Sequence, residues 1–98
     1  MTTTTTTVTV KVVVDTHKHT HYASVVDDQG RVLGHQEFPA TDHGYERLLE
    51  WMRAHGDVHS IGVESTGSFG ATLTRFLRSS GVEVVEVNRP NRLARRLD

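Results

Sequence analysis

Two acidic residues stand at the ends of two apolar runs. Asp15 follows the run VTVKVVV at residues 8–14, and Glu64 closes the run SIGVE at residues 60–64. Such short runs, rich in β-branched residues, are typical of strands. If the two strands are parallel neighbours, both carboxylates lie at the carboxyl edge of a sheet, where open α/β sheets gather their sites. Close carboxylates repel each other unless a cation lies between them, so the pattern predicts a site for Mg²⁺ or Mn²⁺, with the carboxylates about 4–7 Å apart.

The elements that position these acids follow from the rest of the chain. Strands are expected at residues 8–14, 21–26, 31–38, 60–64 and 82–87, the first of them apolar enough to be buried on both faces. Asp27 to Gly30 has the composition of a hairpin turn. One helix is expected from about residue 43 to 55, and a second one follows the fourth strand. The first helix has Trp51 at the edge of an apolar stripe formed by Tyr45, Leu48, Leu49 and Met52, and the stripe of the second consists of Phe69, Leu73, Phe76 and Leu77.

Connection lengths then predict the topology. Short links make the first three strands an antiparallel meander, whereas the two helices are crossovers that return the last two strands parallel to the first. The second strand occupies one side of the first, so the fourth strand pairs on the other side. The expected fold is a ribonuclease-H-like α/β fold with a mixed five-stranded sheet in the order 3-2-1-4-5. In that order Asp15 and Glu64 become neighbours.

The composition indicates the broad class of protein. The 98 residues are 36% hydrophobic, which suits one domain, here residues 8–98 after a threonine-rich lead at residues 1–7 that we expect to be disordered. There is no cysteine, which excludes disulfides and thiolate zinc sites. No apolar run approaches the roughly 20 residues that span a bilayer, so we expect a cytoplasmic protein without membrane contact.

The net charge of −1 does not indicate a nucleic-acid partner, but basic residues cluster near the end of the sequence. Four arginines in the last ten residues would lie largely on one side of a helix and could bind phosphate, although a solvated helix start explains them equally well. We also expect Lys18, close to Asp15, to contact nucleic acid. The four arginines are Arg89, Arg92, Arg95 and Arg96.

Four segments, VVVDTHKHTH, GRVLG, GVESTGSFG and GVEVVEVNRP, resemble the amino-terminal domain of DEDD transposases of the insertion-sequence family numbered one-hundred-and-ten. The resemblance runs from about residue 10 to 96. It implies a RuvC-like domain that holds divalent metal through four acids and exchanges DNA strands together with a serine-bearing domain. It also implies DNA as the partner, a guide RNA, and a homo-oligomer in the full-length protein.

Carried over to this sequence, the first two acids of the family match Asp15 and Glu64. The third and fourth, an Asp pair on the next helix, have no match, and Asp98 lacks the flanking residues of that motif. We therefore expect a domain truncated before the second acid pair and inactive alone, since two-metal chemistry needs more carboxylates than two. The alternative is a non-catalytic nucleic-acid-binding remnant of a mobile element.

Other motifs are weaker. His17, His19 and His21 alternate as zinc or nickel ligands can, but a polar turn explains them better. Residues 66–70 could present a helix start to an anion, yet no Walker motif follows. An actin-like nucleotide site would need glycines after Asp15, where the sequence has bulky residues. Thr16, His17, Lys18, Thr66 and Ser68 remain candidate groups around the acids.

Overall fold

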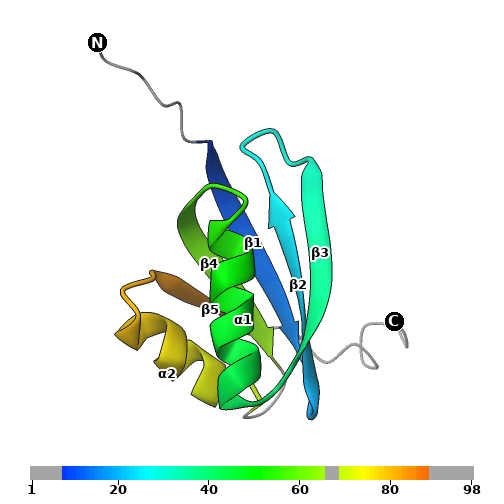
Figure 1. Ribbon diagram of the computed structural model, residues 1–98, viewed down its shortest axis with the longest axis vertical. Coiled ribbons are helices and arrows are strands. Elements are labelled where there is room, and N and C mark those ends of the chain that lie inside the picture. Colours follow the sequence, from blue (N-terminus) through cyan, green and yellow to red (C-terminus); the bar gives the residue numbers. More distant parts are fainter. Residues whose placement is uncertain (1–7, 66–68, 89–98) are drawn as a thin grey trace.

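The computed structural model describes residues 8–65 and 69–88, and its elements follow the predicted order (Figure 1). The predictions for residues 1–7, for Thr66 and Ser68, and for the four arginines at the end of the sequence concern positions outside the described residues. The strands are β1 (Thr9–Thr16), β2 (Thr20–Val26), β3 (Val32–Pro39), β4 (Asp57–Ser65) and β5 (Val84–Asn88), and the helices are α1 (Asp42–Arg53) and α2 (Ala71–Ser79).

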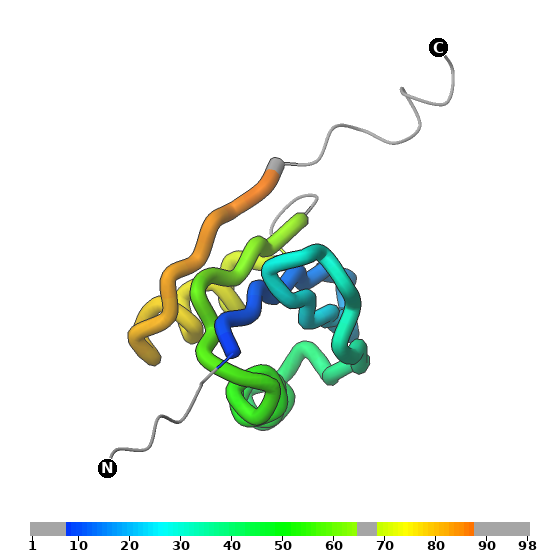
Figure 2. Tube along the Cα trace, turned by 90° about the horizontal axis from the view of Figure 1, so that it is seen from above, coloured from blue at the N-terminus to red at the C-terminus, as the bar shows by residue number. Residues whose placement is uncertain are grey.

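The sheet order is β3-β2-β1-β4-β5, which confirms the prediction. β2 pairs antiparallel with both β1 and β3, whereas β4 pairs parallel with β1 and β5. β3 and β5 therefore form the two edges, which lie at opposite sides of the molecule when it is seen from above (Figure 2). β1 is the central strand.

β1 is buried on one face only, which corrects the expectation of two buried faces. Its residues alternate, so that Val10, Val12 and Val14 are covered whereas Val13 remains 39% exposed. The reason is that α1 and α2 both pack on the same face of the sheet (Figure 1). Side chains of both helices join the inward-facing strand residues in one core: Val10, Val12, Val14, Ala23, Val25, Phe38, Tyr45, Leu48, Met52, Ile61, Val63, Leu73, Leu77 and Val84. We call the opposite side of the sheet the open face.

α1 begins where its sequence indicates. The Thr41 hydroxyl accepts a hydrogen bond from the Gly44 amide at 3.0 Å, which caps the first turn. Gly44 is required there, because a Cβ at this position would lie 1.9 Å from the Pro39 carbonyl oxygen. The cap therefore fixes how α1 leaves β3.

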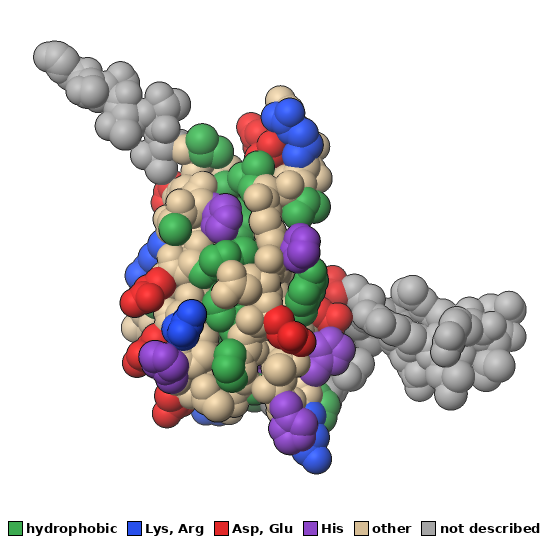
Figure 3. Space-filling view, turned by 45° about the vertical axis from the view of Figure 1, so that its right-hand side comes forward, with side chains coloured by type: hydrophobic (Ala, Val, Ile, Leu, Met, Phe, Trp, Pro, Cys, Tyr) green, Lys and Arg blue, Asp and Glu red, His purple; other side chains and the backbone are tan. Residues whose placement is uncertain are grey.

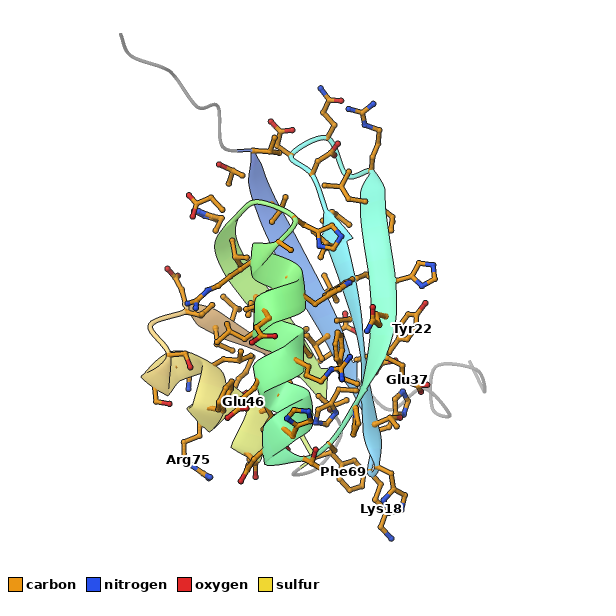
Figure 4. All side chains as sticks on the ribbon, in the orientation of Figure 1. Lys18, Tyr22, Glu37, Glu46, Phe69 and Arg75 are labelled. Carbon is orange, nitrogen blue, oxygen red and sulfur yellow. The ribbon has the colours of Figure 1, made fainter. Side chains whose placement is uncertain are left out.

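α2 corrects one expectation. It starts at Ala71, so Phe69 precedes the helix and is 43% exposed rather than part of its buried stripe. Leu73 and Leu77 are fully buried as expected, and Phe76 is partly buried against the core. With Gly70 as its N-cap, the helix begins two residues later than apolar periodicity alone indicates, and Phe69 is left at the end of the molecule that carries Lys18 (Figure 4).

The hairpin between β2 and β3 is confirmed. One Asp27 carboxylate oxygen accepts hydrogen bonds from the amides of Gln29 and Arg31, both at 2.9 Å, and Gly30 takes the positive φ of 83° that the turn needs. The bond from the Arg31 amide is the main cause that lowers the pKa of the Asp27 carboxyl. Among the described residues, no helix is long and apolar enough to cross a membrane.

Candidate functional site

Asp15 and Glu64 are direct partners in the parallel pairing of β1 with β4. Each follows a buried valine, Val14 or Val63, and successive side chains of a strand point to opposite faces. Both acids therefore lie on the open face, at the carboxyl edge of the sheet. Adjacent strands are about 4.8 Å apart, which places the two backbones within reach of one shared ion. The predicted separation of the carboxylates, about 4–7 Å, stays a prediction.

Two neighbouring residues support this edge. Thr16 is almost fully buried, and its hydroxyl donates a hydrogen bond to the Glu64 carbonyl at 3.1 Å, which ties the ends of β1 and β4 together. The His17 Nε2 atom lies 3.4 Å from Oδ2 of Asp15. Both were candidate groups around the acids, and the structure places both there. Thr16 positions the Glu64 backbone, whereas His17 contacts the Asp15 carboxylate itself.

The donor set fits a hard divalent cation. Carboxylate oxygens are the ligands that Mg²⁺ and Mn²⁺ prefer, and a cation between two close carboxylates would offset their mutual repulsion. Within residues 8–65 and 69–88, no group of three or more His, Cys, Asp or Glu side chains is arranged to hold a metal. The described site therefore offers two carboxylates, which is part of a coordination shell.

The β1–β2 turn extends beyond the two acids. His17, Lys18 and His19 are all exposed, and an amide hydrogen bond from His17 to the Thr20 carbonyl, 3.0 Å, closes the turn. Histidine and cationic side chains gather at the lower tip of the molecule in Figure 3, and Figure 4 places Lys18 at this tip with Phe69 at the same end. A basic and aromatic rim thus borders the edge that carries the acids.

The alternating histidines do not form a common ligand row. His21 is fully buried on the helix-covered face, where its ring stacks on Tyr45 with centroids 5.8 Å apart, whereas His17 and His19 are exposed. Burial lowers the pKa of His21, with a smaller opposing effect from the Thr20 backbone. The zinc or nickel interpretation therefore fails within this segment, and the polar turn is the correct one.

Sequence reasoning missed two residues of the open face. Asp15 pairs with Tyr22 across β1 and β2, and Tyr22 pairs with Glu37 across β2 and β3. Glu64, Asp15, Tyr22 and Glu37 consequently form one row across four strands. Tyr22 and Glu37 project away from α1 in Figure 4. A count of residues across the short β1–β2 turn would have paired Tyr22 with Asp15, whereas the pairing of Tyr22 with Glu37 depends on a register shift between Val25 and Val26 that the sequence does not display.

Comparisons with known proteins agree with this fold. A family model for DEDD transposases of the IS110 type, described as a transposase, matches residues 12–97. Among solved structures, the Pelota protein of Thermoplasma acidophilum has a TM-score of 0.58 and 16% identity over 87% of this chain and 29% of its own. The Pelota protein of Archaeoglobus fulgidus has a TM-score of 0.55 and 12% identity over 84% of this chain and 27% of its own.

The chain thus spans less than a third of either Pelota protein, and at these identities the likeness concerns the fold alone. No curated protein sequence matches significantly.

Proposed function

Since the chain belongs to the family of IS110-type DEDD transposases, we propose that it forms the amino-terminal part of a metal-dependent domain that recombines DNA. One observation carries the proposal: Asp15 and Glu64, which match the first two acids of the family, are register partners on adjacent parallel strands. They come from segments 49 residues apart, and the sheet brings them to one edge.

In this proposal the two carboxylates hold Mg²⁺ or Mn²⁺ through their oxygens. A divalent ion at this edge would stabilise the charge that develops on a phosphoryl group and would lower the pKa of a bound water. The protein's own residues provide the geometry. Thr16 holds the Glu64 backbone against β1, and His17 limits the orientations of the Asp15 carboxylate, because it lies 3.4 Å from one of its oxygens.

The 98 residues supply only half of the acidic site. Two-metal phosphoryl transfer holds ions about 3.5–4 Å apart, which takes more carboxylates than Asp15 and Glu64 provide. We therefore propose that Asp15 and Glu64 act together with the family's second acid pair and serine-bearing domain, and that guide RNA and a second subunit bind the assembled protein. The described domain alone binds metal weakly and does not cut DNA.

DNA reaches the site along the basic rim. Lys18 is exposed beyond the Asp15 edge, where its ammonium group can contact a phosphate without displacing the two acids. The cluster Arg89, Arg92, Arg95 and Arg96 would add further phosphate contacts. These contacts position the strand and carry no sequence information.

The test is the metal dependence of DNA binding, measured by fluorescence anisotropy with a labelled oligonucleotide in EDTA and in Mg²⁺. Without metal the two carboxylates repel phosphate, whereas with metal they attract it through the ion. We expect Mg²⁺ to increase the affinity of the native chain and to have no such effect on Asp15→Asn or Glu64→Gln. Asp28→Asn is the matched control, because Asp28 is an exposed acid of the distant β2–β3 turn. A metal effect that survives in Asp15→Asn and Glu64→Gln contradicts the proposal.

A further inference from the structure

The open face carries an exposed aromatic residue directly beside the acids. Tyr22 is 40% exposed, and its register partner on β1 is Asp15. Val13 and Val87, also on this face, are 39% and 40% exposed. No described helix packs there, because α1 and α2 both cover the other face. The surface next to the candidate metal site is therefore aromatic and apolar as well as acidic.

The Tyr22 ring is held in place by β3. Its hydroxyl forms a hydrogen bond with Nδ1 of His35 at 2.5 Å, and the two ring centroids lie 5.6 Å apart at an interplanar angle of 36°. His35 stands two residues before Glu37, the β3 partner of Tyr22, so the ring leans along the sheet. With its hydroxyl engaged, Tyr22 presents mainly its ring surface to a ligand. The side chain also loses little conformational entropy when something stacks on it.

The neighbours of the ring decide what can bind. Asp15, Glu64 and Glu37 share its row, so an acidic peptide is repelled. Tyr22 is the register partner of Asp15, and adjacent strand backbones are about 4.8 Å apart, so a phosphate attracted by a cation at Asp15 and Glu64 would lie near the ring. The strand spacing is within the span of a single nucleotide, whose base could then meet the ring. Paired bases inside a duplex have both faces covered by their neighbours, so only an unpaired base can stack there.

We propose that Tyr22, held by His35, is a stacking platform for an unpaired nucleobase of the strand whose phosphate is bound at Asp15 and Glu64. This inference rests on the proposed function, since the metal-bound phosphate brings the base to the ring. Tyr22 thereby selects single-stranded or locally opened nucleic acid at the site. Phosphate contacts alone do not discriminate in this way.

Tyr22→Leu tests the platform, because leucine keeps an apolar side chain but removes the ring. We expect its affinity for a labelled single-stranded oligonucleotide to fall at least about fivefold, as for other base–aromatic contacts, with duplex affinity unchanged. Tyr22→Phe, which keeps the ring, should remain within about twofold of the native chain. Val87→Ala is the matched control, since Val87 is the register partner of Glu64 and lies beside the acids without an aromatic ring. Equal single-strand affinities for Tyr22→Leu and the native chain overturn the proposal, as does an equal loss in Val87→Ala.

A second readout covers the case in which Tyr22→Leu does not fold. In the variant Tyr22→Trp with Trp51→Phe, the only tryptophan stands at the platform. Stacking of a base should quench its fluorescence with single-stranded DNA and leave it unchanged with duplex. An unquenched tryptophan in a saturated complex overturns the proposal.

Measurements in EDTA and in Mg²⁺ separate this inference from the proposed function. If Asp15→Asn abolishes the metal effect while Tyr22→Leu binds like the native chain, the metal site stands and the platform is wrong. If Tyr22→Leu loses single-strand affinity but the native chain shows no metal effect, the platform stands and the metal site is wrong.

Discussion

Replacement of His21 by phenylalanine should reduce the loss of stability between pH 7 and pH 5.5. His21 is fully buried against α1, and among the described residues neither ring nitrogen makes a hydrogen bond of regular geometry, so that the Thr20 backbone affects its pKa less than burial does. Its register partners are Thr16 and Phe38, and its ring stacks on Tyr45. None of these neighbours carries a negative charge that could stabilise an imidazolium. The folded protein therefore holds His21 neutral.

The direction and size of this pH effect on stability follow from the linkage between protonation and folding. Burial, the largest cause, lowers the folded-state pKa of His21 below its usual value of 6.5, so the unfolded chain binds a proton more readily than the folded one. The stability contributed by neutral His21 is present above pH 6.5 and is lost as the pH falls below it. One proton per molecule corresponds to about 1.4 kcal/mol per pH unit at full effect, and since the unfolded chain is only partly protonated near pH 6.5, the loss between pH 7 and pH 5.5 is at most about 1.3 kcal/mol.

Urea unfolding followed by circular dichroism at pH 7 and pH 5.5 measures this difference. In His21→Phe the loss of unfolding free energy between the two pH values should be smaller than in the native chain, by at most about 1.3 kcal/mol. At pH 7 the variant should also be more stable, because about 1–3 kcal/mol of uncompensated polar burial disappears. His59→Gln, a change at an exposed histidine of β4, should behave like the native chain. An unchanged pH dependence in His21→Phe would refute the reasoning.

Three further predictions concern the fold, the chemistry and the basic cluster. Gly44→Ala should lower the unfolding free energy by about 1–3 kcal/mol in urea titrations, because the added Cβ would meet the Pro39 carbonyl. Replacing glycine by alanine inside a helix usually raises the unfolding free energy instead. A variant as stable as the native chain, or more stable, would contradict the clash. The 98-residue chain should not nick supercoiled DNA in Mg²⁺ or Mn²⁺, and nicking that Asp15→Ala abolishes would show that two acids suffice. The last change replaces four arginines by glutamine: Arg89, Arg92, Arg95 and Arg96. It should weaken binding equally for all nucleic-acid sequences and flatten the salt dependence of the affinity by about one unit of slope per lost contact. Titrations identical to those of the native chain would show that these residues have no role in binding.

The sheet order was predictable because it depends on connection lengths and strand handedness, which the sequence displays directly. The link of three residues between Thr16 and Thr20 permits only an antiparallel neighbour, and the helix Asp42–Arg53 forces a parallel return. The juxtaposition of Asp15 with Glu64 followed from that order. Their position on the open face did not, because it depends on which face of β1 the helices cover.

The predictions that the structure corrects, and the residue that was overlooked, share a cause. A run of valines is equally compatible with a strand buried on one face or on both, so Val13 was expected to be covered. Phe69 matched the apolar spacing of α2, but the helix begins two residues later, after Gly70. Tyr22 was overlooked because its importance arises from its register with Asp15, not from its own sequence context. Local patterns identify elements, whereas tertiary packing decides which face of each element is exposed.

The central claim is that Asp15 and Glu64 share one divalent ion. Titration of isotope-labelled protein with Mn²⁺ tests it most directly, because the paramagnetic ion broadens nearby amide NMR signals even when binding is weak. The amides of Asp15, Thr16 and Glu64 should broaden first, and this selective broadening should vanish in Asp15→Asn and in Glu64→Gln while persisting in Asp28→Asn. Broadening centred elsewhere, or unchanged in both site variants, would contradict the claim.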